Sequence, residues 1–207
     1  MAMEVSRPEF ELTGGNLALD LANTKSRRPT PDPREDLRGY EDLVAWGEQA
    51  GAIGRDDAVA LRGLAARKPR AARSALARAR DLREAVFAVF SAVAGHRELP
   101  AEALQRVNTA LPAALGRLRL ARAGTGATWT WSGEPDFDRV LWPVVRAAAS
   151  LLTGPERGRI RECGARDCAW LFLDESRNGT RRWCDMAVCG NREKARRFQR
   201  RARRSRG

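Results

Sequence analysis

Four cysteines are the residues in this 207-residue chain whose type and spacing most clearly indicate chemistry. They follow the pattern C-x4-C-x15-C-x4-C, at Cys163, Cys168, Cys184 and Cys189. Two close pairs separated by a hairpin-length insert are typical of a four-thiolate zinc site, because four sulfurs must converge at about 2.3 Å around one Zn²⁺. We therefore expect Zn²⁺ as the cofactor, with these four cysteines as its ligands.

The alternatives are two disulfides, buried cysteines without a metal, or an iron–sulfur cluster, which paired gaps around a hairpin suit less well. The compartment helps to choose among them. The sequence has no apolar run of membrane-spanning length, and its first residues, MAMEVSRPEFEL, do not resemble a signal peptide. We expect a cytoplasmic protein with no membrane partner. Disulfides are rare in that compartment, which favours zinc.

The insert between the cysteine pairs indicates a β-hairpin. Residues 169–174 (AWLFLD) have strand character, Asn178-Gly179 is a turn signal, and residues 181–184 return toward the second pair. Trp170 and Trp183 would then pack across the hairpin. A knuckle, a hairpin and a final helix form the order of a treble-clef zinc finger. Such a small module has little core, so the metal would supply most of its folding free energy, on the order of 10 kcal/mol.

The final helix is expected to begin at the second cysteine pair. Cys189 would lie in its first turn, and Asn191 would cap it. Gly190 would be required where the backbone is crowded near the metal. Ala195, Phe198 and Ala202 form a short apolar stripe, and we expect this stripe to dock on the zinc module with Phe198 as its anchor.

Positive charge is concentrated in the same region. The chain carries 38 basic and 26 acidic residues, a net charge of +12, and residues 155–207 hold 16 basic and 7 acidic residues, a net of +9. Glu193 is the only acidic residue after Asp185, so neighbouring arginines would repel one another unless a polyanion lay against them. Compensation of the thiolate charge, or contact with a membrane or a protein, are the alternatives. The residues expected to contact nucleic acid are Arg177, Arg181, Arg182, Arg192, Lys194, Arg196, Arg197, Arg200, Arg201, Arg203 and Arg204.

The rest of the chain must position this module, and its patterns are mainly helical. Thr153-Gly154-Pro155 is a cluster of helix breakers, so we expect a helical domain at 1–154 and a zinc finger at 155–207. A hairpin with Trp129 and Trp131 on one face interrupts the helical part. The expected elements are a short strand at 10–13, a loop at 27–38, hairpin strands at 117–122 and 127–132, and helices at 16–24, 40–50, 56–67, 70–95, 101–116 (with a break at Pro112) and 136–152.

Nothing in residues 1–154 indicates catalysis. His96 is the only histidine of the chain and follows the end of a predicted helix, where a surface position is the simplest interpretation. No cysteine precedes Cys163, so no nucleophile and base are evident.

The cysteine region resembles the CGNR zinc finger, named for the residues that stand here as Cys189-Gly190-Asn191-Arg192. The surrounding pattern, C-x4-C-x-W-x-F-x-D-x-S-R-N-G-x-R-R-W-C, is also similar and begins at Cys163. Ala169 replaces the glycine that usually precedes the first tryptophan of that pattern. The resemblance covers about residues 160–204 and implies that the four cysteines bind zinc.

The N-terminal part is similar to the ABATE domain that accompanies this finger, through L-D-L-x-N-T at Leu19–Thr24. The resemblance implies a stress-induced bacterial transcription regulator with a helical N-terminal domain. Asn23 and Thr24 would be polar caps at a helix end or part of a small-molecule pocket.

These observations predict a zinc-dependent DNA-binding transcription regulator. The arginine-rich helix would contact DNA, and the helical domain would sense a small-molecule effector or mediate assembly, for example as a homodimer. One alternative is an RNA-binding or ribosome-associated factor. The other is a small-molecule enzyme with the finger as a structural appendix, and strongly perturbed carboxylates converging in a pocket would favour it.

Overall fold

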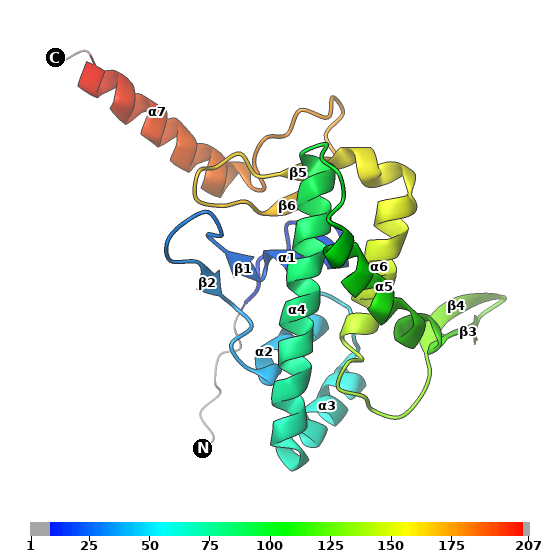
Figure 1. Ribbon diagram of the computed structural model, residues 1–207. Helices are drawn as coiled ribbons and strands as arrows, with labels where there is room; N and C mark the ends of the chain where they lie inside the picture. Colours follow the sequence, from blue (N-terminus) through cyan, green and yellow to red (C-terminus); the bar gives the residue numbers. More distant parts are fainter. Residues whose placement is uncertain (1–8, 205–207) are drawn as a thin grey trace.

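A long central helix organises the helical part of the chain (Figure 1). The computed structural model describes residues 9–204 of the chain, and the side chains of residues 9–201. The central helix α4 (Pro69–Ala94) has Pro69 in its first turn, where the missing N–H of proline leaves no hydrogen bond unmade. Leu76, Leu82, Val86 and Phe90 recur along one face of α4 and are buried. The predicted helix at 70–95 is confirmed.

Shorter helices pack around α4 (Figure 1). The helix α5 continues through Pro112 instead of breaking there, because it ends only three residues later at Leu115. The helix α6 begins at Leu141 rather than at 136, and Pro143 then lies in its first turn, where no N–H donor is needed. The bounds are α1 (Leu17–Asn23), α2 (Tyr40–Gln49), α3 (Arg55–Arg67), α5 (Ala101–Leu115) and α6 (Leu141–Thr153).

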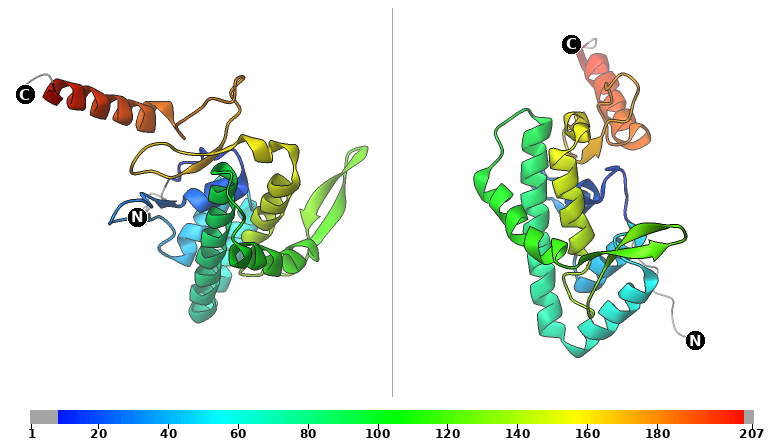
Figure 2. Two further views of the ribbon diagram at one scale, coloured as in Figure 1. Left: turned by 45° about the horizontal axis from the view of Figure 1, so that its top comes forward. Right: turned by 90° about the vertical axis from the view of Figure 1, so that its right-hand side faces the viewer.

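Two short antiparallel strand pairs belong to this part. The predicted hairpin is confirmed as β3 (Leu118–Ala123) and β4 (Gly126–Trp131), with Leu120 opposite Trp129. It projects from the helices (Figure 2). The predicted loop at 27–38 is confirmed only in part: residues 27–33 connect β1 (Lys25–Ser26) to β2 (Arg34–Glu35), and β2, which pairs with β1, lies within the predicted loop.

The strand predicted at 10–13 is wrong. Phe10 has no strand partner, because the side-chain amide of Gln49 accepts from its backbone N–H and donates to its carbonyl. A side chain of α2 thus satisfies the groups that a second strand would have paired.

The strand after the first cysteine pair has a different partner from the one predicted. β6 (Leu171–Leu173) pairs with β5 (Ile160–Glu162), which precedes Cys163, so the first cysteine pair lies in the connection of this β-hairpin. Residues 181–184 form no strand, and Trp170 and Trp183 therefore do not face each other across strands. The prediction is wrong about which segment pairs with β6. The strand pair, the cysteine knuckle and the final helix that it expected are all present.

A buried carboxylate explains why the chain does not return beside β6. Asp174 accepts hydrogen bonds from the backbone N–H and the hydroxyl of Ser176, and from the backbone N–H of Arg181. These bonds close the loop at 174–181 upon itself. Although burial raises the pKa of Asp174, the hydrogen bonds from Ser176 and Arg181 hold it below its ordinary value.

The pair β5–β6 packs against the helical part rather than standing apart from it. Ile160, Leu171 and Leu173 belong to the same hydrophobic core as α1 and α4. The side-chain amide of Asn23 in α1 donates to the carbonyl of Leu171 and accepts from its N–H, each at 2.9 Å, as a neighbouring strand would. The N–H of Leu173 donates to the carbonyl of Gly14 at 2.9 Å. These contacts fix the finger to the helical part, and we refer to the two hydrogen bonds between Asn23 and Leu171 as the clamp.

The last helix, α7 (Asn191–Arg204), projects from the body of the protein (Figure 1). The predicted docking of its apolar stripe is wrong, because Phe198 is 74% exposed and Ala195 is exposed. The first two turns of α7 contact the module, where Glu193 is buried and Arg196 pairs with Asp167. Beyond these turns α7 points away from the module, so Phe198 does not contact it. The side chain of Ala202 lies outside the described residues.

Candidate metal centre, basic helix and cavity

The sulfurs of the four cysteines converge on one point. The Sγ atoms of Cys168 and Cys184 are 3.6 Å apart, as are those of Cys184 and Cys189, and all four lie within 4.8 Å of one another. A tetrahedron of sulfurs at about 2.3 Å from Zn²⁺ has edges of about 3.8 Å, whereas a disulfide needs about 2.05 Å. All four cysteines are buried and unbonded to each other. The geometry fits one metal ion and does not fit disulfides.

The chemistry of the donor set also fits a soft divalent cation. Hydrogen bonds from Cys168 and Cys184 lower the pKa of Cys163 to about 2. The bond with the Cys163 sulfur raises the pKa of Cys168 and Cys184 in return. Without a cation the cluster therefore favours one thiolate shared among thiols. Four buried thiolates require a concentrated positive charge among them, and Zn²⁺ supplies it when bound.

The local backbone structure orients the sulfurs of each cysteine pair toward the common point. After β5, the N–H of Cys163 donates to the carbonyl of Trp170, which closes the first knuckle. The second pair lies around a helical turn, Met186–Gly190, that runs directly into α7. Asp185 caps this turn by accepting from the N–H of Val188 at 2.8 Å. The prediction that Cys189 lies at the start of the last helix is confirmed to within this turn.

Two residues of the CGNR motif have roles that differ from those predicted. Asn191 has helical backbone angles and is the first residue of α7, so the cap is Asp185 rather than Asn191. Gly190 is required by crowding, as expected, but the crowding comes from side chains rather than from the metal. A Cβ at this position would lie 2.4 Å from the sulfur of Met186 and 3.0 Å from Cδ1 of Trp183.

The substitution of Ala169 for the usual glycine has a conformational consequence. Ala169 has a φ of 61°, in the left-handed region where a Cβ clashes with the following carbonyl. A glycine there avoids this strain, which explains why the resembling pattern has one.

Three of the arginines predicted to contact nucleic acid are held by the finger itself. Arg192 donates to the sulfur of Cys189 at 3.2 Å and pairs with Asp167 at 3.0 Å. Arg196 pairs with Asp167 at 2.8 Å and with Glu193 at 2.6 Å. Arg181 donates to the carbonyls of Trp183 and Cys184 and lies over the ring of Phe172. These contacts of Arg181, Arg192 and Arg196 fix the cysteine turns and the start of α7.

The remaining predicted contacts whose side chains the structure describes lie on the surface. Arg182 lies over the ring of Trp183, 5.3 Å from its centroid, and leaves its charge toward solvent. The side chains of Arg203 and Arg204 lie outside the described residues. The exposed basic residues of the set are Arg177, Arg182, Lys194, Arg197, Arg200 and Arg201.

A polar cavity of about 300 Å³ lies where the finger meets the helical part, and Asn23 and Thr24 line it. Neither side chain has much hydrogen-bonding capacity left for a ligand. Both polar atoms of the Asn23 amide bind Leu171, and the Thr24 hydroxyl donates to the carbonyl of Leu21 at 2.7 Å. Asp20, Trp46 and Trp170 also line the cavity, and none of them was among the predicted site residues. Asp20 lay within the L-D-L-x-N-T motif, whereas no local signal links the two tryptophans.

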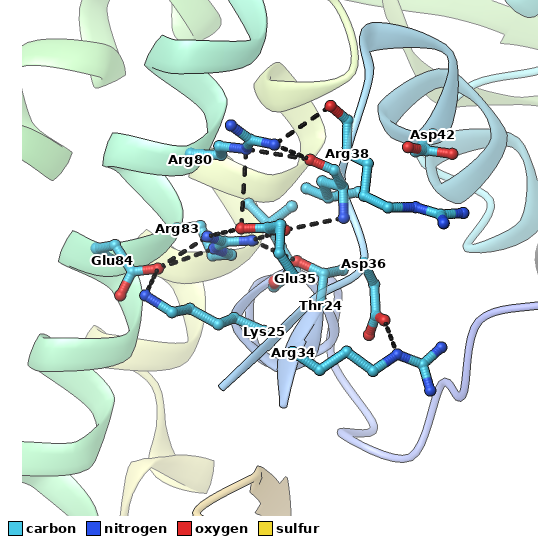
Figure 3. Close-up of polar contacts among 12 residues, drawn as sticks. Thr24, Lys25, Arg34, Glu35, Asp36, Arg38, Asp42, Arg80, Arg83 and Glu84 are labelled. Atoms are coloured by element: carbon cyan, nitrogen blue, oxygen red, sulfur yellow. Dashed lines mark hydrogen bonds and ion pairs between the residues drawn. The ribbon is translucent and has the colours of Figure 1, made fainter. Parts of the chain in front are cut away.

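An ion-pair network (Figure 3) includes Arg34, Glu35 and Asp36, which line this cavity. Arg83 of α4 is 2% exposed and donates to both carboxylate oxygens of Glu35, at 2.6 and 2.7 Å. Burial raises the pKa of Glu35, but the bonds from Arg83 bring it below its ordinary value. Arg34 lies on the opposite face of the β1–β2 ribbon from Glu35, and it pairs with Asp36 at 2.8 Å. The network ties β1–β2 to α4.

Comparison with known families agrees with this architecture. Residues 15–155 match the ABATE family, described as "Putative stress-induced transcription regulator", and residues 159–202 match the CGNR zinc finger. No curated protein matches the sequence. Within the described residues, every helix is too short or too polar to cross a membrane. Since the ABATE match covers more than half of the chain, this protein is a member of the ABATE family that carries a C-terminal CGNR zinc finger with Zn²⁺ as its cofactor.

Proposed function

We propose that this protein is a DNA-binding transcription regulator whose α7 contacts the phosphates of duplex DNA. The observation that carries the proposal is the exposure of basic side chains along α7. Lys194, Arg197 and Arg200 are exposed, and no carboxylate within the described residues pairs with them. Like charges along one helix repel, and a polyanion removes that cost.

The metal and the side chains around it set the direction of α7. Cys163, Cys168, Cys184 and Cys189 would hold Zn²⁺, which supplies a cross-link between the knuckle and the turn before α7. Asp167 lies in the knuckle and pairs with both Arg192 and Arg196 of α7. These pairs orient the helix axis from a second point, so α7 leaves the finger in one direction.

The helical part is proposed to control how this helix is presented. We divide the chain near residue 154, where α6 has just ended, into a regulatory part and a finger. The clamp of Asn23 on Leu171 transmits the position of α1 directly to β6. A change in the helical part, through a ligand or a second subunit, would therefore move the finger and α7.

The test is the salt dependence of binding to duplex DNA, measured by fluorescence anisotropy with zinc-loaded protein. If about six phosphates are contacted, the affinity falls roughly 10³-fold between 50 and 200 mM salt. Replacing Arg197 and Arg200 with alanine should lower the slope of log K against log salt by about 2.

The matched control replaces Arg70 and Arg73 with alanine. Both are exposed, both lie on the first turns of α4, and neither is near α7 (Figure 1). This control changes the net charge equally and should leave the slope unaltered. Equal slopes for wild type and the Arg197/Arg200 variant would refute the proposal, and a strong preference for structured RNA over duplex DNA would redirect it to RNA.

A further inference from the structure

The cavity between the helical part and the finger has the features of a ligand site. Its volume of about 300 Å³ is at the lower end of the range for small-molecule pockets. Its walls come from α1, α2, the β1–β2 ribbon, the segment at 9–11 and Trp170 of the finger. Acidic residues outnumber basic residues five to two in this lining.

Asp20 is the buried acidic residue of the lining, and within the described residues it has no cation beside it. Its carboxylate is 7% exposed and accepts from the backbone N–H of Gly14 at 2.8 Å, and no basic side chain within the described part pairs with it. Glu35 and Asp36, by contrast, pair with Arg83 and Arg34 (Figure 3). A buried carboxylate without a partner is costly, and a cationic ligand would remove that cost.

Two tryptophans of the lining have unused donors. The indole N–H groups of Trp46 and Trp170 are buried and have no hydrogen-bond partner within the described residues. These nitrogens are closed to solvent, so the tryptophans offer the cavity their rings, which are favourable neighbours for an organic cation.

We propose that this cavity binds a small organic cation, such as an amine, a guanidine or a quaternary ammonium, with Asp20 as the anchor for its charge. Glu9 and Glu11 are exposed at the same cavity and add to its negative field. Gly14 is hydrogen-bonded both to Asp20 and to Leu173, which connects the segment beside Asp20 to β6.

The position of the cavity links such a ligand to the finger. The carbonyl of Trp170 accepts from the N–H of Cys163 at 2.8 Å, so an occupant that shifts Trp170 acts on the cysteine knuckle. The role of the ligand as an effector rests on the proposed function, whereas the binding site itself does not.

Binding can be tested on the full zinc-loaded chain by calorimetry at pH 8. The probes are ethanolamine, agmatine and choline, with glycolate and succinate as anionic counterparts. We expect at least one cationic probe to bind and the anions not to bind. Replacing Asp20 with asparagine should weaken binding by roughly 10- to 100-fold, because a charge-assisted bond is lost.

The control is Asp81→Asn, which removes an exposed carboxylate of α4 that does not line this cavity. Unaltered binding by this control, with loss in Asp20→Asn, supports the site. Binding of none of the cations, a preference for the anions, or equal binding by wild type and Asp20→Asn would overturn it. These measurements contain no DNA, so a failure of DNA binding leaves their outcome intact, and the reverse also holds.

Discussion

Replacing Asp20 with asparagine should stabilise the protein at neutral and alkaline pH. Burial raises the pKa of Asp20 from 3.8 to about 6, against the smaller opposing effect of the hydrogen bond from Gly14. A folded-state pKa above the unfolded value means that the folded state binds the proton more tightly. Ionisation of Asp20 therefore destabilises the fold as pH rises from about 4 to 6, and the full penalty persists above that range.

The size of the effect follows from the shift. About two pKa units correspond to about 3 kcal/mol of unfolding free energy at pH 8. At pH 5 about half of this penalty remains, because Asp20 is then mostly protonated in the folded state but mostly ionised in the unfolded state. Asparagine keeps an oxygen that can accept from Gly14 and carries no charge. It therefore removes the penalty without leaving that N–H unpaired.

The assay is urea unfolding followed by circular dichroism, in excess zinc, for wild type and Asp20→Asn at several pH values from 5 to 8. The zinc site is common to both proteins, so its own pH dependence cancels in the difference. We expect the variant to be more stable by up to about 3 kcal/mol at pH 8, with a gap that narrows toward pH 5. A variant less stable than wild type at pH 8, or a gap independent of pH, would refute the assignment of a buried, unpaired carboxylate.

Three further substitutions test the finger and its clamp. Ala169→Gly should raise the free energy of unfolding by about 1 kcal/mol, measured by urea titration, because it relieves a left-handed φ; a loss of stability would argue against this backbone conformation. Asn23→Ala should cost about 2–4 kcal/mol in the same assay, since it leaves the N–H and carbonyl of Leu171 unpaired; a loss below 0.5 kcal/mol would mean that the clamp is not made. Gly190→Ala should lower zinc affinity in a chelator competition, because its Cβ would strike Met186; unchanged affinity would show that the turn can relax.

The features that sequence reasoning identified correctly are local ones. The cysteine spacing specifies a converging set of sulfurs because each pair needs only one tight turn. The helix α4 is predictable because Leu76, Leu82, Val86 and Phe90 repeat within a single element. The hairpin β3–β4 is signalled by alternation on both sides of a glycine-containing turn.

The errors concern partners that are distant or unexpected. The apolar run at 169–174 indicated a strand but could not name its partner. The Asn178-Gly179 turn signal serves a loop closed on Asp174 instead. Asn23 was assigned to a cap or pocket, because nothing in the sequence shows that an amide in α1 pairs with a strand 148 residues away. The apolar Phe198 suggested docking, but the direction of α7 depends on Asp167 and the metal.

We propose that one metal ion held by Cys163, Cys168, Cys184 and Cys189 sets the orientation of α7. X-ray absorption at the zinc edge, with the metal content of the purified full-length chain, tests this most directly. We predict one zinc per chain with four sulfur neighbours at about 2.3 Å. A folded chain without stoichiometric zinc, or zinc with nitrogen or oxygen neighbours in place of sulfur, would contradict it.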